Sequence, residues 1–269
     1  MIPFIDLKTQ YLKIEDKIKN RINNILEHGQ YIMGPEVKEL ETDLCNYIGT
    51  KHSIGCASGT DALILALLAL DIKAGDEVIV PDFTFFGTAE VVSLIGATPV
   101  FVDIDPDTYN LDPVKANVAV TNKTKAIIPV SLYGLTADLD AFMKIAKEHG
   151  ISIIEDGAQS FGATYKVDNK IKASCNIATI STTSFYPAKP LGAYGDAGAV
   201  FTNDDELALK MRQLLNHGQE SGYHHIHIGL NGRIDTIQAA ILVEKLSIFK
   251  NEITLRNQVA SNYHRAFEG

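Results

Sequence analysis

The sequence contains no tryptophan and only three cysteines among its 269 residues. Cys45, Cys56 and Cys175 lie far apart and form no Cys-x-x-Cys pair, so we expect buried, reduced thiols rather than a disulfide framework. Basic residues are outnumbered as well. The sequence has 24 lysines and arginines and 33 acidic residues, which gives a formal net charge of −9. This balance argues against a nucleic-acid partner, since nucleic acid selects basic surfaces.

Long apolar runs and targeting signals are also absent. The longest apolar stretch, residues 62–70, is much shorter than the roughly 20 residues that a membrane-spanning helix needs. The N-terminus lacks the basic segment followed by an apolar segment that marks a secretory signal. We therefore predict a soluble, cytoplasmic protein with no membrane partner. Since 46% of the residues are hydrophobic, the chain is able to bury a large core.

The apolar pattern that is present alternates between strands and helices. Short, continuous apolar runs are typical of parallel strands covered on both faces, and they lie at residues 78–80, 127–130 and 153–154. Helical periodicity separates them at 88–95 and 137–149. The predicted fold class is α/β, a mostly parallel sheet covered by helices on both faces. Residues 162–173 indicate a polar loop, and 234–249 and 252–267 indicate helices.

One lysine stands in an unusual sequence context. Lys189 lies between Pro187 and Pro190, and three glycines follow at three-residue spacing. The prolines restrict the backbone around the amine, and the glycines allow tight turns and close approach of another group. This setting fits a Schiff-base lysine, which has to be held in place and partly desolvated. A structural turn with an incidental lysine is the alternative.

Polar groups follow other predicted strands. Residues 58–60, Ser-Gly-Thr, join a strand to a buried helix, so their N–H groups and hydroxyls form an anion site that suits phosphate. A plain serine N-cap explains this motif more simply when it is taken alone. Asp156 ends a strand at the carboxyl edge, where it can hold a proton on a ring nitrogen while Gln159 binds a ring oxygen. The alternative is that Glu155 and Asp156 only solvate a loop.

Aromatic residues and histidines give weaker signals. Phe83 and Phe85 follow a strand end. One of them is able to stack there on a planar ring; the alternative is that both belong to the core. The four histidines within residues 216–228 lack partner cysteines or carboxylates at ligand spacing, so we expect no metal site. Asn231 and Arg233 precede a helix, and simple capping plus a surface arginine accounts for them.

Together these groups match the requirements of pyridoxal 5'-phosphate. A lysine carries this cofactor as an imine, an acid keeps its pyridine nitrogen protonated, a helix start holds its phosphate and an aromatic ring stacks on it. The motifs GxxxxGK[ST] and GxGxxG are absent, which removes the two common nucleotide-binding signatures.

Five motifs occur in a characteristic order: SGTDAL at 58–63, PDFTF at 81–85, EDGAQS at 155–160, SFYPAK at 184–189 and GLNGR at 229–233. In this order they resemble the DegT/DnrJ/EryC1/StrS family of nucleotide-sugar aminotransferases, which are fold-type I pyridoxal-phosphate enzymes. The segments HGQYI at 28–32 and VDIDP at 102–106 are similar to a branch that aminates the 3-keto form of UDP-N-acetylglucosaminuronic acid for surface polysaccharide such as O-antigen.

The resemblance implies a role for each matching position around the cofactor ring. Lys189 would form the imine with the cofactor aldehyde. Asp156 would pair with the pyridine nitrogen, Gln159 would contact the ring hydroxyl, and Phe85 would stack on the ring.

The resemblance also implies contacts to the phosphate and to the substrate. Gly59, Thr60 and Ser184 would bind the phosphate, and Asn231 would reach it from the partner subunit of a homodimer. Arg233 would approach a substrate carboxylate as its counter-charge.

The reaction implied is the transfer of an amino group from glutamate to a nucleotide-linked keto-sugar. A 4-keto or dTDP-linked sugar, or a non-catalytic or regulatory cofactor-binding relative, are the alternatives. The family's dehydratase branch has histidine in place of Lys189, so this lysine argues against it. Because family members continue into a smaller C-terminal domain, we expect a large domain over residues 1–250 with an N-terminal helical segment. Residues 251–269 would begin a helical connection to a small domain that this chain lacks.

Overall fold

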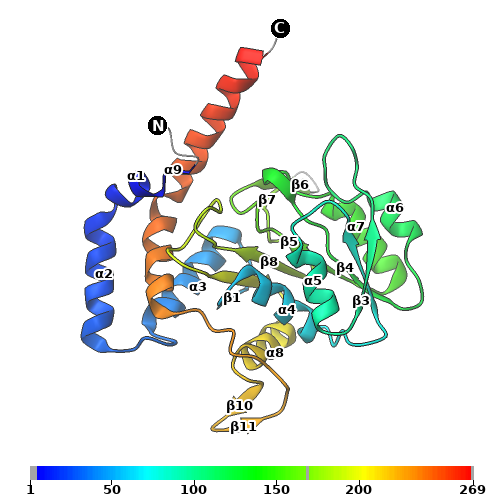
Figure 1. Ribbon diagram of the computed structural model, residues 1–269, viewed down its shortest axis with the longest axis horizontal. Coiled ribbons are helices and arrows are strands. Elements are labelled where there is room, and N and C mark those ends of the chain that lie inside the picture. Colours follow the sequence, from blue (N-terminus) through cyan, green and yellow to red (C-terminus); the bar gives the residue numbers. More distant parts are fainter. Residues whose placement is uncertain (1–4, 168–169, 268–269) are drawn as a thin grey trace.

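A computed structural model describes residues 5–167 and 170–267 of the protein. Residues 1–4 and 268–269, at the outer limits of the predicted domains, and residues 168–169 of the predicted polar loop lie outside the described residues. The centre of the molecule is a seven-stranded sheet with the order β1-β9-β8-β5-β4-β2-β3 (Figure 1). Its strands are β1 (His52–Cys56), β2 (Glu77–Pro81), β3 (Thr98–Val102), β4 (Thr124–Ile127), β5 (Ser152–Asp156), β8 (Ile180–Ser184) and β9 (Gly198–Thr202).

The sheet is mostly parallel, which confirms the predicted fold class. Five neighbouring strands pair in parallel: β3, β2, β4, β5 and β8. In contrast, β9 runs antiparallel to both β1 and β8. A parallel connection needs a crossover, usually through a helix. The chain between β8 and β9 contains no helix and returns directly, so β9 is reversed. The loop that carries Lys189 is this direct return.

Helices cover both faces of the sheet. One face packs against α4 (Gly59–Ala69), α5 (Gly87–Leu94) and α8 (Asp205–Leu215). On the other face, α3 (Pro35–Ile48) and α9 (Thr236–Phe267) cover one half, and α6 (Pro113–Val118) and α7 (Leu139–His149) cover the other. Val200 of β9 contributes to the first face, and its neighbours Ala199 and Phe201 contribute to the second, as strand alternation requires.

The N-terminal helical segment consists of α1 (Leu7–Leu12), α2 (Glu15–His28) and α3. Buried isoleucines of α2 recur at helical spacing, and Gly29 ends this helix in the left-handed conformation, as Gly49 ends α3. The Asp204 side chain accepts hydrogen bonds from two N–H groups of α8, so the expected cap is present. α2 and α3 both pack against α9, which ties the two ends of the chain together.

The prediction of a polar loop at residues 162–173 was wrong. The segment forms an antiparallel hairpin of β6 (Thr164–Val167) and β7 (Lys170–Ala173). Lysines 166, 170 and 172 give the hairpin a polar composition. A hairpin with one solvated face tolerates such a composition, because only alternate residues have to be apolar.

The two helices predicted near the C-terminus form one continuous helix, α9. Its first half is buried, through residues such as Ala239, Leu242 and Phe249, whereas its second half extends away from the body of the molecule (Figure 1). Among the helices of the described residues, none combines the length and the apolar character needed to cross a membrane. Two short elements complete the fold, the turn η1 (Leu132–Gly134) and the hairpin of β10 (Gln219–Ser221) and β11 (His224–His225).

Candidate active site

A cavity of about 370 Å³ opens at the carboxyl ends of β5 and β8, beside the start of α4. Ligands of parallel α/β sheets bind at this edge. Seven of the nine side chains and backbone positions expected to bind cofactor or substrate line this cavity: Gly59, Thr60, Phe85, Asp156, Gln159, Ser184 and Lys189.

The start of α4 forms one end of the cavity. The Ser58 hydroxyl accepts a hydrogen bond from the Asp61 N–H at 3.0 Å, so this serine is an N-cap. Gly59 and Thr60 are the first residues of α4, where helix geometry leaves N–H groups without an intrahelical acceptor. A Cβ on Gly59 would lie 2.6 Å from the Ser184 Cβ, so only glycine lets the helix start approach β8 this closely. N–H groups and hydroxyls at a helix start suit a phosphate group.

Asp156 forms the floor of the cavity. It is buried, and its Oδ1 and Oδ2 accept hydrogen bonds from the Ala158 N–H and the Thr88 hydroxyl, both at 3.1 Å. Burial raises the pKa of Asp156, and the two hydrogen bonds and the charge of Lys189 oppose that rise. A buried carboxylate that retains free acceptor capacity suits a protonated ring nitrogen. The alternative reading, in which Glu155 and Asp156 solvate a loop, was wrong because both are buried.

Glu155 supports this floor from the opposite face of β5. Its buried carboxylate accepts hydrogen bonds from the hydroxyls of Ser131, Ser174 and Ser181 and from the Cys175 N–H, at 2.8–3.2 Å. Burial raises the pKa of Glu155, and these hydrogen bonds oppose the rise. The donors come from three separate segments, so no local motif indicates the network. The only signal in the sequence is a glutamate in an apolar strand.

Lys189 is half-buried on the loop between β8 and β9. Its N–H donates to the Tyr186 carbonyl at 2.8 Å, and a Cβ on Gly192 would lie 2.4 Å from the Pro187 carbonyl oxygen. The loop therefore folds back on itself with the lysine at its bend. Burial lowers the pKa of Lys189, and the negative charge of Asp156 opposes this effect. A lowered pKa makes the neutral, nucleophilic amine easier to form.

Gln159 and Phe85 border the cavity from two sides. The Gln159 Oε1 accepts a hydrogen bond from the Tyr133 N–H at 2.8 Å, which orients the amide so that Nε2 is its donor group. Phe85 lines the cavity and is 72% exposed. Phe83 instead packs against Tyr109, with ring centroids 5.8 Å apart, and does not line the cavity. Of the two phenylalanines, Phe85 is the one placed to stack on a bound ring.

Replacing Phe85 with alanine should weaken cofactor binding without unfolding the protein. Because the ring is exposed, we expect the free energy of unfolding of the cofactor-free chain to change by less than about 0.5 kcal/mol. Loss of the stacked ring should raise the cofactor dissociation constant about three- to tenfold, as measured by fluorescence titration. The matched control is Phe86→Ala, because Phe86 is 71% exposed but does not line the cavity. Equal weakening in both variants would contradict a stacking role for Phe85.

Asn231 and Arg233 lie outside the cavity. The Ala57 N–H donates to the Gly232 carbonyl at 2.8 Å, so the segment 231–233 runs beside the residues that lead into α4. Asn231 is exposed, and the Arg233 Nη1 donates to the Asn216 Oδ1. The Arg233 Nε is buried and has no hydrogen-bond partner within residues 5–167 and 170–267. The two roles expected for these residues, reaching a partner subunit's site and binding substrate, stay predictions.

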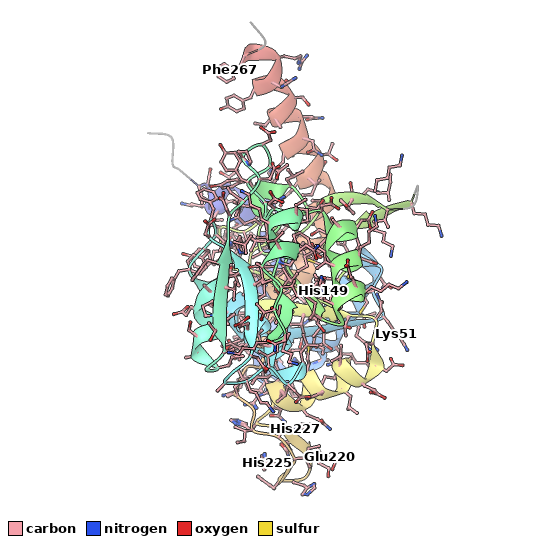
Figure 2. The ribbon with its side chains drawn as sticks, turned by 90° about the vertical axis from the view of Figure 1, so that its right-hand side faces the viewer. Lys51, His149, Glu220, His225, His227 and Phe267 are labelled. Carbon is pink, nitrogen blue, oxygen red and sulfur yellow. The ribbon has the colours of Figure 1, made fainter. Side chains whose placement is uncertain are left out.

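The four histidines within residues 216–228 lie on or next to the β10–β11 hairpin at the far end of the molecule. Figure 2 shows His225, His227 and Glu220 projecting there, away from the sheet. Across the part of the chain that the structure describes, no three His, Cys, Asp or Glu side chains are placed to hold a metal ion.

The groups around the cavity fit a single kind of cofactor. A half-buried lysine, a buried carboxylate, a helix start with a hydroxyl beside it and an exposed aromatic ring surround one space, as a pyridoxal-phosphate enzyme requires. The chain belongs to the DegT/DnrJ/EryC1/StrS aminotransferase family, whose sequence profile matches residues 12–269. Its cofactor is accordingly pyridoxal 5'-phosphate.

Several known proteins are similar to this chain. The UDP-2-acetamido-2-deoxy-3-oxo-D-glucuronate aminotransferase of Pseudomonas aeruginosa is 59% identical over 98% of this chain and 72% of its own length. A protein of Geobacillus stearothermophilus named pleiotropic regulatory protein is 46% identical over 99% of this chain and 71% of its own. The crystal structure of NtdA from Bacillus subtilis, with bound pyridoxamine phosphate, superposes with a TM-score of 0.85. It is 35% identical, over 93% of this chain and 56% of that one.

Proposed function

We propose that the protein transfers an amino group from L-glutamate to the 3-keto carbon of UDP-2-acetamido-3-oxo-glucuronate, for the biosynthesis of a surface polysaccharide such as O-antigen. The observation that carries the proposal is the cavity that brings Lys189, Asp156 and the start of α4 together. The substrate assignment is supported by the 59% identity to the Pseudomonas aeruginosa enzyme, which extends over 98% of the chain.

Each residue of the cavity has a task in this reaction. The bound cofactor would supply an electron sink for the carbon that loses a proton. The Lys189 amine would take that proton and later return it, because its lowered pKa makes the neutral amine available as a general base. Asp156 would hold the proton on the ring nitrogen, and Gln159 would donate to the ring hydroxyl. The N–H groups at the start of α4 would hold the phosphate.

Two half-reactions test the proposal. The cofactor-loaded protein should lose its absorbance near the visible range when glutamate is added, since the amino form of the cofactor no longer conjugates with an aldehyde or imine. Addition of the 3-keto UDP-uronate should then restore that absorbance. A dTDP-linked 4-keto sugar is the matched comparison. Faster recovery of the absorbance with this sugar would show that the substrate is a dTDP-linked 4-keto sugar and not the UDP-uronate.

The similarity to a protein named as a regulator favours a second candidate, a cofactor-binding protein without turnover. Both candidates bind pyridoxal phosphate through Lys189, so binding alone does not separate them. A regulator would show the cofactor spectrum but no spectral change with glutamate. Repeated turnover with glutamate and keto-sugar would exclude it.

We further propose that the protein acts as a homodimer in which each subunit contributes Asn231 to the phosphate end of its partner's site. Asn231 is exposed on a segment that runs beside the start of α4, which supports a contact made from outside the chain's own cavity. The buried, free thiols of Cys56 and Cys175 support a reducing compartment, the cytoplasm.

Mixed dimers provide the test of site sharing. Asn231→Asp should place a negative charge against the partner's phosphate and weaken turnover, and Lys189→Ala should abolish it. Co-expression of the two variants with different tags should restore about a quarter of the wild-type activity, since half of the dimers are mixed and each has one intact site. Activity of the mixture at half that of Asn231→Asp alone would show that the sites are not shared, because each mixed dimer would then have one weakened site and one dead site.

A further inference from the structure

The turn η1, which follows β4, holds a tyrosine in an unfavourable backbone conformation. Tyr133 has φ 53° and ψ 21°, in the left-handed region that favours glycine. A bulky residue adopts this region only where the surrounding structure enforces it, and such residues cluster at functional sites.

Buried polar groups enforce this conformation from both sides of the turn. The Asn110 side chain is 5% exposed; its Oδ1 accepts from the Leu132 N–H at 3.0 Å, and its Nδ2 donates to the Leu135 carbonyl at 3.1 Å. The Ser131 hydroxyl donates to the buried Glu155 carboxylate at 3.2 Å. These bonds hold the backbone, so the Tyr133 side chain is free to serve another purpose.

The same turn is connected directly to the cavity. The Tyr133 N–H donates to the Oε1 of Gln159, which lines the cavity, at 2.8 Å. The Tyr133 side chain is 72% exposed; it does not itself line the cavity, but this bond holds its backbone next to a residue that does. On pyridoxal phosphate the ring hydroxyl is adjacent to the aldehyde carbon. With Gln159 at the ring hydroxyl, as the proposed function has it, a substrate would approach the reacting carbon near this residue.

We propose that the Tyr133 ring contacts the sugar of the nucleotide-sugar substrate and thereby helps to select it, an inference that rests on the proposed function. A phenol ring offers a flat apolar face to the C–H groups of a sugar and a hydroxyl for a hydrogen bond. Glutamate is small and carries its charges close to the reacting carbon, so it has less need of a ring at the rim. Tyr133 should therefore act in the keto-sugar half-reaction and not in the glutamate half-reaction.

The test compares variants of Tyr133 with matched variants of Tyr109. Tyr109 also lies in the left-handed region, with φ 59°, and is 49% exposed, but its ring packs against Phe83, which does not line the cavity. Tyr133→Gly and Tyr109→Gly both relieve backbone strain, so both should fold. We expect only Tyr133→Gly to raise the KM for the 3-keto UDP-uronate, about five- to tenfold, with the glutamate half-reaction changed less than twofold. Tyr133→Phe keeps the ring, so it should retain most of the ring's contribution to the KM for the 3-keto UDP-uronate.

Binding measured without turnover separates this inference from the proposed function. Calorimetric titration with UDP-N-acetylglucosaminuronate, which has no keto group, should show the same five- to tenfold weakening in Tyr133→Gly. Wild-type protein that binds this ligand more tightly than the variant but shows no amino transfer would refute the function and retain the inference. Equal binding by wild type and Tyr133→Gly, equal loss in Tyr109→Gly, no binding by wild type, or equal loss in both half-reactions would overturn the inference.

Discussion

Replacing Lys189 with alanine should abolish amino transfer and the covalent bond to the cofactor aldehyde. The lysine is the only amine lining the cavity in the part of the chain that the structure describes, and it would act both as the attachment point and as the base that moves the proton. Loss of a positioned base alone costs about 10²–10⁴-fold in rate, so a decrease at the upper end of this range or beyond is expected. Single-turnover absorbance with glutamate measures it.

Borohydride reduction followed by peptide mass spectrometry gives an independent readout of the same residue. In wild-type protein the reduced cofactor should remain attached to the peptide that contains Lys189, and in Lys189→Ala no peptide should carry it. Lys250→Ala is the matched control, because Lys250 is exposed on α9, away from the cavity lining. Cofactor attached elsewhere in the wild type, or normal turnover by Lys189→Ala, would refute the assignment of the site.

Replacing Asp156 with asparagine should have the second largest effect. The amide is nearly the same size but carries no charge, so the protonated ring nitrogen would lose its buried partner. Breaking a buried ion pair costs about 3–5 kcal/mol, which corresponds to about 10²–10⁴-fold in cofactor affinity or rate. The cofactor dissociation constant and the rate of the glutamate half-reaction measure the two contributions separately.

The control for this variant is Asp82→Asn. Asp82 follows β2 at the same edge of the sheet, but it is exposed and does not line the cavity. Its removal should change cofactor affinity less than twofold, because exposed charges interact weakly through water. If Asp156→Asn bound the cofactor and reacted as the wild type does, the ring nitrogen would not be held by this carboxylate.

The parts of the site that follow directly after strands were accessible from the sequence. Gly59, Asp156 and Lys189 each follow or end a strand at one edge, and parallel strands bring their carboxyl ends together whatever lies between them. The helix caps at Gly29, Gly49 and Asp204 were accessible for the same reason, since a cap depends on a few adjacent residues.

The contacts that join distant segments were not accessible. Thr88 bonds to Asp156, and three serines surround Glu155, but their spacing in the chain contains no period or motif. The β6–β7 hairpin was missed because each of its strands has only four residues, too few for their alternation of polar and apolar residues to stand out from a polar loop. The conformation of Tyr133 depends on Asn110, which lies on another loop, so only the folded chain shows it. These features depend on tertiary contacts, which the local sequence pattern does not indicate.

The hydroxyl groups gathered around Glu155 have a consequence for how the cofactor enters. These hydroxyls join β5, which ends at Asp156, to three other parts of the chain through hydrogen bonds that involve no ligand. The rim is thus preorganised, and a molecule that arrives there meets groups already in position instead of ordering them. Little conformational entropy is lost on association, so uptake should follow simple second-order kinetics with no slow isomerisation step.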